Sequence, residues 1–328
     1  MSFHRLRSAL ALLALTLLAS ACDISAIVVK GAAKTTARGS IALEGHWDYE
    51  LATATMPNSI IQLEGMLVIV PDEPRIVTTL LRAYVGYTYG VVEDLAEDAE
   101  FRGDVSVGEY HRERAKYLYQ RAKDLGVYLL QLEADGMEEA VAGGVGAFEE
   151  WLRKSFKKKE HAEMLLWAGY AWGNWINGSK DNMAAVADLP YVKALVQRSL
   201  ELDDTIFYGA GYLMLAMIAT NEMGADLDAA RALWDKAIAG NGRRALLPLL
   251  NMGRHYAVKR GDRDLFVSLM VEVLEAPDLL PEGRLSNMIA KRRAARYLAQ
   301  VDEFFIPGGG DDLEDDLDVE DEENEAEN

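Results

Sequence analysis

Apolar residues recur along most of this chain at the three- and four-residue spacing of an amphipathic helix. Ile60, Leu63, Leu67 and Val70 follow this spacing, and Pro71 ends it, because proline cannot continue a helix. The β-branched residues before Pro71 leave a strand as the alternative for this one segment. No convincing run of alternating apolar and polar residues is found elsewhere. The pattern therefore predicts an all-α protein.

Short polar residues and glycines mark where the expected helices begin and end. Asp72, Asp226 and Asp262 each stand just before an apolar periodic stretch, where an aspartate side chain can cap the first free amides. Residues 240–242, which read Gly-Asn-Gly, and Gly261 follow such stretches and are expected to stop them.

A spacing of small-x3-aromatic-x2-small residues recurs along the helical part of the chain. The matches are Ala115, Tyr119 and Ala122; more loosely Val192, Val196 and Ser199; then Ala230, Trp234 and Ala237; and, on a first helix, Gly253 with Tyr256. A small residue lets two helices approach closely, and a ring one turn away fills the remaining space. Such matches in order predict a tetratricopeptide-like helical-hairpin solenoid, wound as a right-handed superhelix, with irregular repeats.

The expected hairpins follow from these matches and from the stop signals between them. They cover about residues 72–135, 160–202, 205–239 and 243–276. Pro281–Gln300 is expected to form a final capping helix.

The N-terminus has the pattern of an export signal. Arg5 and Arg7 precede an apolar run, and the small residues 19–21 precede Cys22, the single cysteine of the chain. A cysteine at this place makes the segment look like a bacterial lipoprotein signal, so residues 1–21 are expected to be a signal peptide and Cys22 the lipidation site. An uncleaved transmembrane helix would need about 20 apolar residues, which this run does not supply. With one cysteine, an internal disulfide is excluded.

Composition divides the rest of the chain into three parts. Residues 22–40 are small and basic and predict a lipidated tether, residues 41–306 form the helical repeat domain, and residues 307–328 predict a disordered acidic tail. The chain holds 34 basic and 53 acidic residues, a net charge of −19. Such a surface repels phosphate backbones, so we expect no nucleic-acid partner.

A series of short words from about residue 47 to residue 305 is similar to the TRAP-transporter T-component (TatT) family of periplasmic lipoproteins. The words are Asp48-Tyr49-Glu50-Leu51, Met56-Pro57, Leu63-Glu64-Gly65, Ala83-Tyr84-Val85-Gly86-Tyr87, Trp167-Ala168, Trp172-Gly173, Val186-Ala187-Asp188-Leu189-Pro190, Arg198-Ser199-Leu200-Glu201-Leu202-Asp203-Asp204, Tyr208-Gly209-Ala210, Arg284-Leu285-Ser286-Asn287 and Ala290-Lys291-Arg292-Arg293-Ala294. No single word is diagnostic, but their order behind a lipoprotein signal is specific. The acidic tail and residues 148–159 depart from the family pattern.

The resemblance implies a periplasm-facing, lipid-anchored accessory subunit of a tripartite ATP-independent periplasmic (TRAP) transporter system. It would bind the periplasmic solute-binding protein and help to hand over an apolar or organic-acid ligand through a pore in each subunit, and a homotrimer is among the assemblies it implies. Asp23, after the cysteine, resembles the signal that withholds lipoproteins from the outer membrane, and so favours the inner membrane. The alternative from another class is a general periplasmic tetratricopeptide scaffold for peptides or envelope-assembly factors.

Six aromatic residues are the candidates for the wall of a ligand channel. They are Trp167, Tyr170, Trp172, Trp175, Tyr208 and Tyr212. Small residues stand between them and would allow close helix contact or let backbone approach a ligand. The competing interpretation is that the six rings fill the cores of two hairpins.

One more stripe allows two interpretations. It consists of Phe148, Trp151, Leu152, Ser155 and Phe156, and three lysines at 157–159 follow it. It predicts either a packed amphipathic helix with cations near its negative end or a face that meets a membrane or a partner.

Residues typical of catalysis are not grouped in the sequence. The five histidines are far apart, and the chain has no HExxH, no GxSxG and no metal-spaced cysteine pair. The glycine-rich stretch at 142–148 lacks the Lys-Ser/Thr ending of a phosphate loop. We therefore expect neither an enzyme nor a cofactor or metal site.

Overall fold

The computed structural model describes residues 25–305, and within this range the chain forms helices and no β-strand. The expected all-α class is thus confirmed for this part of the chain. The predicted signal peptide (1–21), the lipidation site Cys22 and the acidic tail (307–328) lie outside the described residues. Among the described helices, none is both long and apolar enough to span a membrane.

The first half of the described chain consists of long helices with short connections. They are the N-terminal helix (residues 25–44), α2 (Tyr49–Ile69), α3 (Pro74–Tyr87), the π-helix η1 (Thr88–Val92), α4 (Glu93–Phe101), α5 (Val105–Glu133), α6 (Met137–Ala142), α7 (Val145–Ser155) and α8 (His161–Asn177). The segment before Pro71 is therefore helical, and the strand alternative is wrong.

The second half continues with shorter helices. They are α9 (Met183–Val186), α10 (Leu189–Leu202), the 3-10 helix η2 (Ile206–Gly209), α11 (Ala210–Asn221), α12 (Leu227–Ala239), α13 (Leu247–Asn251), the π-helix η3 (Met252–Ala257), α14 (Val258–Arg260), α15 (Arg263–Glu275), the 3-10 helix η4 (Pro281–Gly283), α16 (Arg284–Ala299) and α17 (Val301–Phe304).

Successive helices pack as pairs at the places where the sequence predicts hairpins. The run from α3 through η1 to α4 packs along α5, α8 packs on α10, α11 packs on α12, and η3 packs on α15. The pair α6 and α7 is inserted between the first two hairpins and packs on α10 through α7. The order of the pairs agrees with the four expected hairpins, and α16 occupies the place of the expected final helix.

Two of the three expected aspartate caps are present. The side chain of Asp226 accepts hydrogen bonds from the amides of Asp228 and Ala229, both at 3.0 Å, and Asp262 caps α15 in the same way. The expectation for Asp72 is wrong, because the cap residue of α3 is Glu73, which makes no side-chain capping bond. Proline in the first turn of α3 lacks an amide hydrogen, so one of the free donors that a cap would satisfy is missing.

The small and aromatic residues of the repeated spacing lie at helix crossings. Tyr119 and Trp234 are fully buried, and the indole N–H of Trp234 donates to the hydroxyl of Thr220 at 2.9 Å. A Cβ atom on Gly126 would lie 3.1 Å from the Cα of Ala168, so α5 and α8 approach closely at that glycine. The expected role of the small residues in close helix packing is thus observed.

The stripe on α7 is a packing face. Phe148, Leu152 and Phe156 are fully buried and belong to the core between α5, α8 and α10. The guanidinium of Arg198 on α10 donates to the carbonyl of Phe156 at 2.8 and 3.1 Å. The packed-helix interpretation of this stripe therefore holds.

Residues 25–40 of the predicted tether are helical and packed instead of forming a loose linker. Ala33 is buried beside Val70 and Ile76, and Ala26 and Val29 pack in the same small cluster. These side chains recur at helical spacing, but their small size makes the apolar stripe inconspicuous in the sequence.

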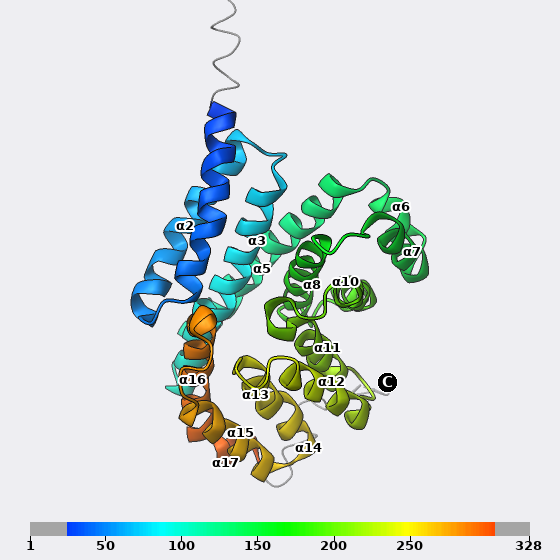
Figure 1. Ribbon diagram of the computed structural model, residues 1–328. Helices are drawn as coiled ribbons and strands as arrows, with labels where there is room; N and C mark the ends of the chain where they lie inside the picture. The colour runs from blue at the N-terminus through cyan, green and yellow to red at the C-terminus, as the bar shows by residue number, and fades with distance from the viewer. Residues whose placement is uncertain (1–24, 306–328) are drawn as a thin grey trace, which may run out of the picture.

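The hairpins follow a curved path that brings α16 back to α2 and α4, near the start of the described chain (Figure 1). Helix α16 packs against α2 and α4. Gly90 in η1 permits this approach, because a Cβ atom there would lie 2.7 Å from the Cδ1 atom of Ile289 on α16. The helices therefore enclose an inner face, toward which parts of η1, α8, η3 and α16 are directed.

Candidate functional site

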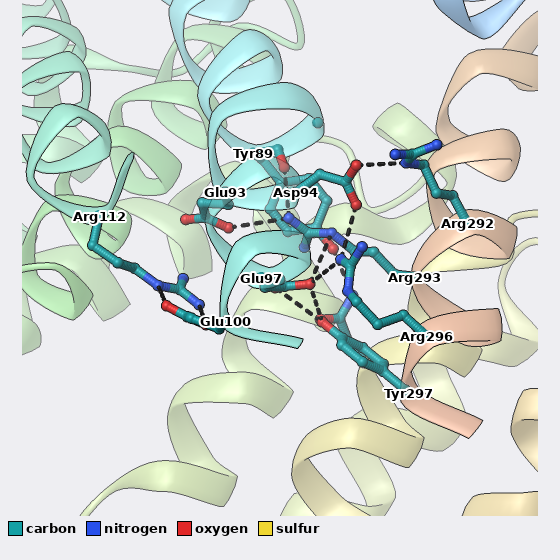
Figure 2. A network of polar contacts seen from close by, with 12 residues as sticks. Tyr89, Glu93, Asp94, Glu97, Glu100, Arg112, Arg292, Arg293, Arg296 and Tyr297 are labelled. Carbon is teal, nitrogen blue, oxygen red and sulfur yellow. Dashed lines mark hydrogen bonds and ion pairs between the residues drawn. The ribbon is translucent and has the colours of Figure 1, made fainter. Parts of the chain in front are cut away.

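The contact that closes the curve is a buried network of charges between α4 and α16 (Figure 2). Asp94 accepts from the Nε atom of Arg292 at 2.6 Å and from Nη2 of Arg296 at 2.8 Å. Arg296 also pairs with Glu97 at 2.5 Å. Asp94 is 2% and Arg296 7% exposed, so the pair between them is largely withdrawn from water and far less screened than a surface pair, whereas Arg292 approaches Asp94 from the exposed side.

Arg293 is the innermost cation of this network. It is 2% exposed, donates to the carbonyl of Tyr89 at 2.7 Å and lies 3.5 Å from a carboxylate oxygen of Glu93. Its guanidinium carbon also stands 4.1 Å from the centre of the Tyr89 ring. Burial opposes the charge on Arg293, but Tyr89, Glu97 and Glu93 outweigh it and raise the arginine pKa.

The two π-helical segments of the described chain meet beside Arg293. Tyr89 belongs to η1, and its hydroxyl lies 3.3 Å from Nδ2 of Asn251, the residue that precedes η3. A π-helical turn inserts an extra residue into a helix, changes the direction of nearby side chains, and is frequent at functional sites. Here both insertions face the same interior region.

Several side chains around Arg293 are deep in the fold and still reach solvent. Tyr170, His255 and Glu93 each keep part of their surface accessible. Desolvation is nevertheless the largest cause of their pKa shifts: it raises the pKa of Tyr170 and Glu93, and it lowers the pKa of His255 to about 3. We call Tyr89, Glu93, Tyr170, Asn251, His255 and Arg293 the inner cluster.

A cavity of about 630 Å³ between α4, α5 and the end of α8 reaches this cluster at Glu93. Tyr119, which also lines the cavity, donates to Glu93 at 2.9 Å. Toward the outside the cavity wall carries carboxylates and two cations: Glu100, Glu109, Glu113, Asp181, Arg112 and Lys116. The cavity thus connects a charged surface to the inner cluster.

A second group of side chains, the Arg82 cluster, consists of Glu44, Arg82, Glu163, Trp167 and Phe207. Arg82 on α3 pairs with Glu163 on α8 at 3.0 Å and with Glu44 at 2.5 Å. Its guanidinium carbon lies 4.7 Å from the centre of the Phe207 ring, and the rings of Phe207 and Trp167 meet edge-on at 5.0 Å. Elements far apart in the sequence therefore converge on Arg82.

The backbone at Phe207 is strained. Phe207 and Tyr208 have φ values of 46° and 61°, and Gly209 follows at 82°. Two consecutive bulky residues in the left-handed region cost about 1–2 kcal/mol each. Such strain persists where surrounding contacts over-determine it, and it clusters at ligand-binding sites.

Trp167 and Tyr170 connect the two clusters. Their rings are 5.6 Å apart, and Tyr170 donates to the carbonyl of Ala210 at 2.7 Å. The indole nitrogen of Trp167 is enclosed and has no hydrogen-bond partner among the described residues. A line of rings thus runs from Phe207 through Trp167 and Tyr170 toward Tyr89.

The other four aromatic candidates lie elsewhere. Trp172 is buried in the core, where its indole N–H donates to Asp188 at 3.2 Å and its ring stacks on Tyr191. Trp175, on the same side of α8, is covered by the ammonium group of Lys123 at 3.9 Å. Tyr208 is half-buried, with its ring 3.4 Å from the position of a Cβ atom on Gly283. Tyr212 faces Asp204 at 3.5 Å. The six aromatic candidates therefore do not line one common site: Trp167 and Tyr170 lie between the two clusters, and the other four lie elsewhere.

The sequence pattern does not distinguish most members of the inner cluster from ordinary helix positions. The extra residues of η1 and η3 leave the sequence helical in pattern, so the redirected Tyr89 and His255 resemble ordinary helix positions. One usable signal was available. The acidic run Glu93-Asp94-x-x-Glu97 and the basic run Arg292-Arg293-x-x-Arg296 have the same spacing and opposite charge.

The described residues contain no group of three or more His, Cys, Asp or Glu side chains arranged to hold a metal ion.

Comparison with known proteins identifies one family. The family model described as TRAP transporter T-component matches residues 45–305, which include the inner cluster and every member of the Arg82 cluster except Glu44. A search of curated proteins gives no match.

Proposed function

The chain belongs to the TRAP transporter T-component family, and from this premise we propose that it is a lipid-anchored accessory subunit of a TRAP transporter system. In this proposal it faces the periplasm, binds the periplasmic solute-binding protein and helps to hand over ligand. The family membership supports the transport role. The signal-like segment that ends at Cys22 supports the export and the lipid anchor.

We also propose that the helical pairs are degenerate tetratricopeptide-like repeats wound into a right-handed solenoid. The support comes from the order of the pairs and from the buried small and aromatic residues at their crossings. In this reading the inner face of the curve is the concave face of the solenoid, which such proteins use for binding.

The observation that carries the ligand role is the line of rings between the two clusters. Trp167 and Tyr170 stay in the proposed channel wall, together with Phe207, while Trp172 is assigned to the core. Rings supply apolar contact, and the enclosed indole N–H of Trp167 supplies a hydrogen-bond donor. An organic acid with an apolar part matches both features, because its oxygen can accept from the indole while its carbon chain lies against the rings.

Binding of the solute-binding protein is the first test. The purified chain is titrated calorimetrically with the solute-binding proteins of TRAP transporters from the same organism, in the presence and absence of their ligands. We expect a saturable complex. Absence of binding in both states would contradict the proposal, and binding of extended peptides instead would favour the general scaffold.

Ligand capture is tested with a panel of organic-acid anions and a long-chain fatty acid, monitored by tryptophan fluorescence and calorimetry. We expect Trp167→Ala to weaken binding of the preferred compound by tenfold or more and Trp167→Phe to restore part of it. Trp172→Phe is the matched control, because it keeps a ring in the core and leaves the proposed wall intact. Equal affinities of folded Trp167→Ala and wild type would remove Trp167 from the channel.

The lipid anchor is tested by fractionation of cells. Cys22→Ser is expected to release the protein from the membrane fraction or to leave the precursor uncleaved. Density-gradient separation then asks whether the native protein travels with inner-membrane markers, as Asp23 leads us to expect. A Cys22→Ser protein that matures and fractionates like wild type would exclude lipidation.

A further inference from the structure

Four aliphatic side chains are exposed together at one end of the molecule. Ile27 and Val28 on the N-terminal helix are 66% and 63% exposed, and Val68 and Ile69 on α2 are 83% and 52% exposed. Branched aliphatic side chains are usually buried, and none of these four belongs to the fold's core clusters. We call these four residues the apolar tip.

The contacts beneath the tip show that the two pairs lie at the same end. Ala26 and Val29 pack in one cluster with Met66, Leu67 and Val70, so the start of the N-terminal helix lies beside the end of α2. Figure 1 shows the beginning of the N-terminal helix projecting at the edge of the molecule, away from the closed curve of the later helices.

The position of Cys22 brings this end close to a membrane. Cys22 stands three positions before residue 25, where the described part of the helix begins, and three positions span at most about 10 Å. This step rests on the lipid anchor of the proposed function. If Cys22 carries lipid, the apolar tip lies within reach of the interface between head groups and acyl chains, where an amphipathic helix buries its apolar side chains.

The positive charge of the N-terminal helix also favours a membrane surface as the partner of the apolar tip. Residues 25–43 contain Lys30, Lys34 and Arg38 and no carboxylate, although the whole chain carries −19. All three cations are exposed, and Lys30 lies 3.9 Å from one carboxylate, that of Glu73 on α3. A basic helix on an acidic protein suits the surface of a bilayer that contains anionic lipids.

We propose that the apolar tip inserts into the surface of the membrane that holds the anchor, as a second contact beside the lipid. Acyl chains alone leave the protein free to swivel about Cys22. Insertion of side chains from two helices fixes the orientation of the body, so that α2 and the N-terminal helix stand on the bilayer and the inner face keeps a constant direction relative to it.

The test uses the polypeptide from residue 22 onward with Cys22→Ser, which keeps every described element and lacks lipid. Its partitioning is measured by flotation with vesicles of phosphatidylcholine and phosphatidylglycerol at 70:30, and with phosphatidylcholine alone. We expect binding to the anionic vesicles, a loss of about tenfold in Ile27→Ser/Val68→Ser, and a smaller loss in Lys30→Gln/Lys34→Gln that is confined to the anionic vesicles.

Ile61→Ser is the matched control, because Ile61 is a 69% exposed aliphatic side chain in the middle of α2. It should bind like the parent chain. Absence of vesicle binding by the parent chain, or equal losses in the tip and control variants, would overturn the proposal. So would a tip variant that changes the sedimentation coefficient but not vesicle binding, since the tip would then join copies of this chain. Because no lipid is attached, the result is independent of the Cys22 fractionation.

Discussion

For some residues of this fold the sequence predicts the structural role, and for others it does not. Tyr119 and Trp234 are buried at helix crossings, as their spacing from small residues predicts. Trp167 and Trp172 are separated by five positions on one helix, yet one faces the interior line of rings and the other packs under Asp188 and Tyr191. The sequence shows that both are large and apolar, but which neighbour covers each depends on helices that are distant in the chain.

His255 provides a prediction for stability against pH. In the fold its pKa is lowered to about 3, chiefly by desolvation, from a value of 6.5. Between about pH 3 and pH 6.5 the unfolded chain therefore binds a proton at His255 that the folded chain does not. Stability should fall as the pH drops through this window, with a contribution from His255 of up to about 1.4 kcal/mol per pH unit.

His255→Gln should remove this contribution. Urea unfolding between pH 7 and pH 4.5 should give a shallower decline of the unfolding free energy in the variant, while the two curves run parallel above about pH 7.5. Parallel curves over the whole range would mean that folded His255 titrates like an exposed histidine.

Among the helices, those with a regular apolar stripe were predictable and those that depend on small side chains or on inserted residues were not. The four hairpins and the final helix agree with the expected positions. The N-terminal helix was not expected, because alanines carry most of its packing face. The π-helical turns η1 and η3 lie where Tyr89 meets Asn251 and Gly90 meets Ile289 of α16, and their sequences keep the pattern of ordinary helix.

Alanine substitutions of two helical glycines are expected to change the stability of the fold in opposite directions. Gly126→Ala should destabilise the fold by about 1–3 kcal/mol, because the new methyl group would lie 3.1 Å from backbone of α8 that cannot easily move. Gly65→Ala on α2 should stabilise it by about 0.5–1 kcal/mol, since no atom lies within 4 Å of the new group and alanine favours the helix. Thermal unfolding of both variants checks the pair, and an unchanged or raised melting temperature of Gly126→Ala would refute the close crossing of α5 and α8.

The closed curve belongs to the molecule as a whole and could not be predicted from any segment. The residues of η1 and α4 that meet α16 in Figure 2 are about 200 positions from their partners: 198 for Asp94 and Arg292 and 204 for Tyr89 and Arg293. The final helix was expected to cap the last hairpin, which α16 does through its contact with α15. The same helix also covers α4. This second contact depends on the orientations of all the hairpins between α4 and α16, which together determine the curvature of the path.

The closing network should contribute more to stability than any surface pair. Asp94→Ala leaves Arg292 and the buried Arg296 without one partner and should lower the unfolding free energy by about 3–5 kcal/mol. Glu100→Ala is the matched control, because it breaks an exposed pair with Arg112 and should cost less than about 1 kcal/mol. Hydrogen exchange should also quicken along α16 and α2 in the first variant alone. Similar losses in the two variants would show that the closing network is no stronger than an exposed pair.

The contact between α16 and α4 also determines when the closed curve can form during translation. A ribosome completes Glu93, Asp94 and Glu97 almost two hundred residues before it adds Arg292, Arg293 and Arg296. Loop closure over that distance waits for every hairpin between. In the nascent chain, Glu93, Asp94 and Glu97 therefore lack their arginine partners until α16 emerges from the ribosome. A chain interrupted before Arg284 would retain folded hairpins but would remain an open arc, in which Tyr89 and Glu93 face bulk water. The closed interior therefore forms only after α16 has been made, and only chains that include α16 possess it.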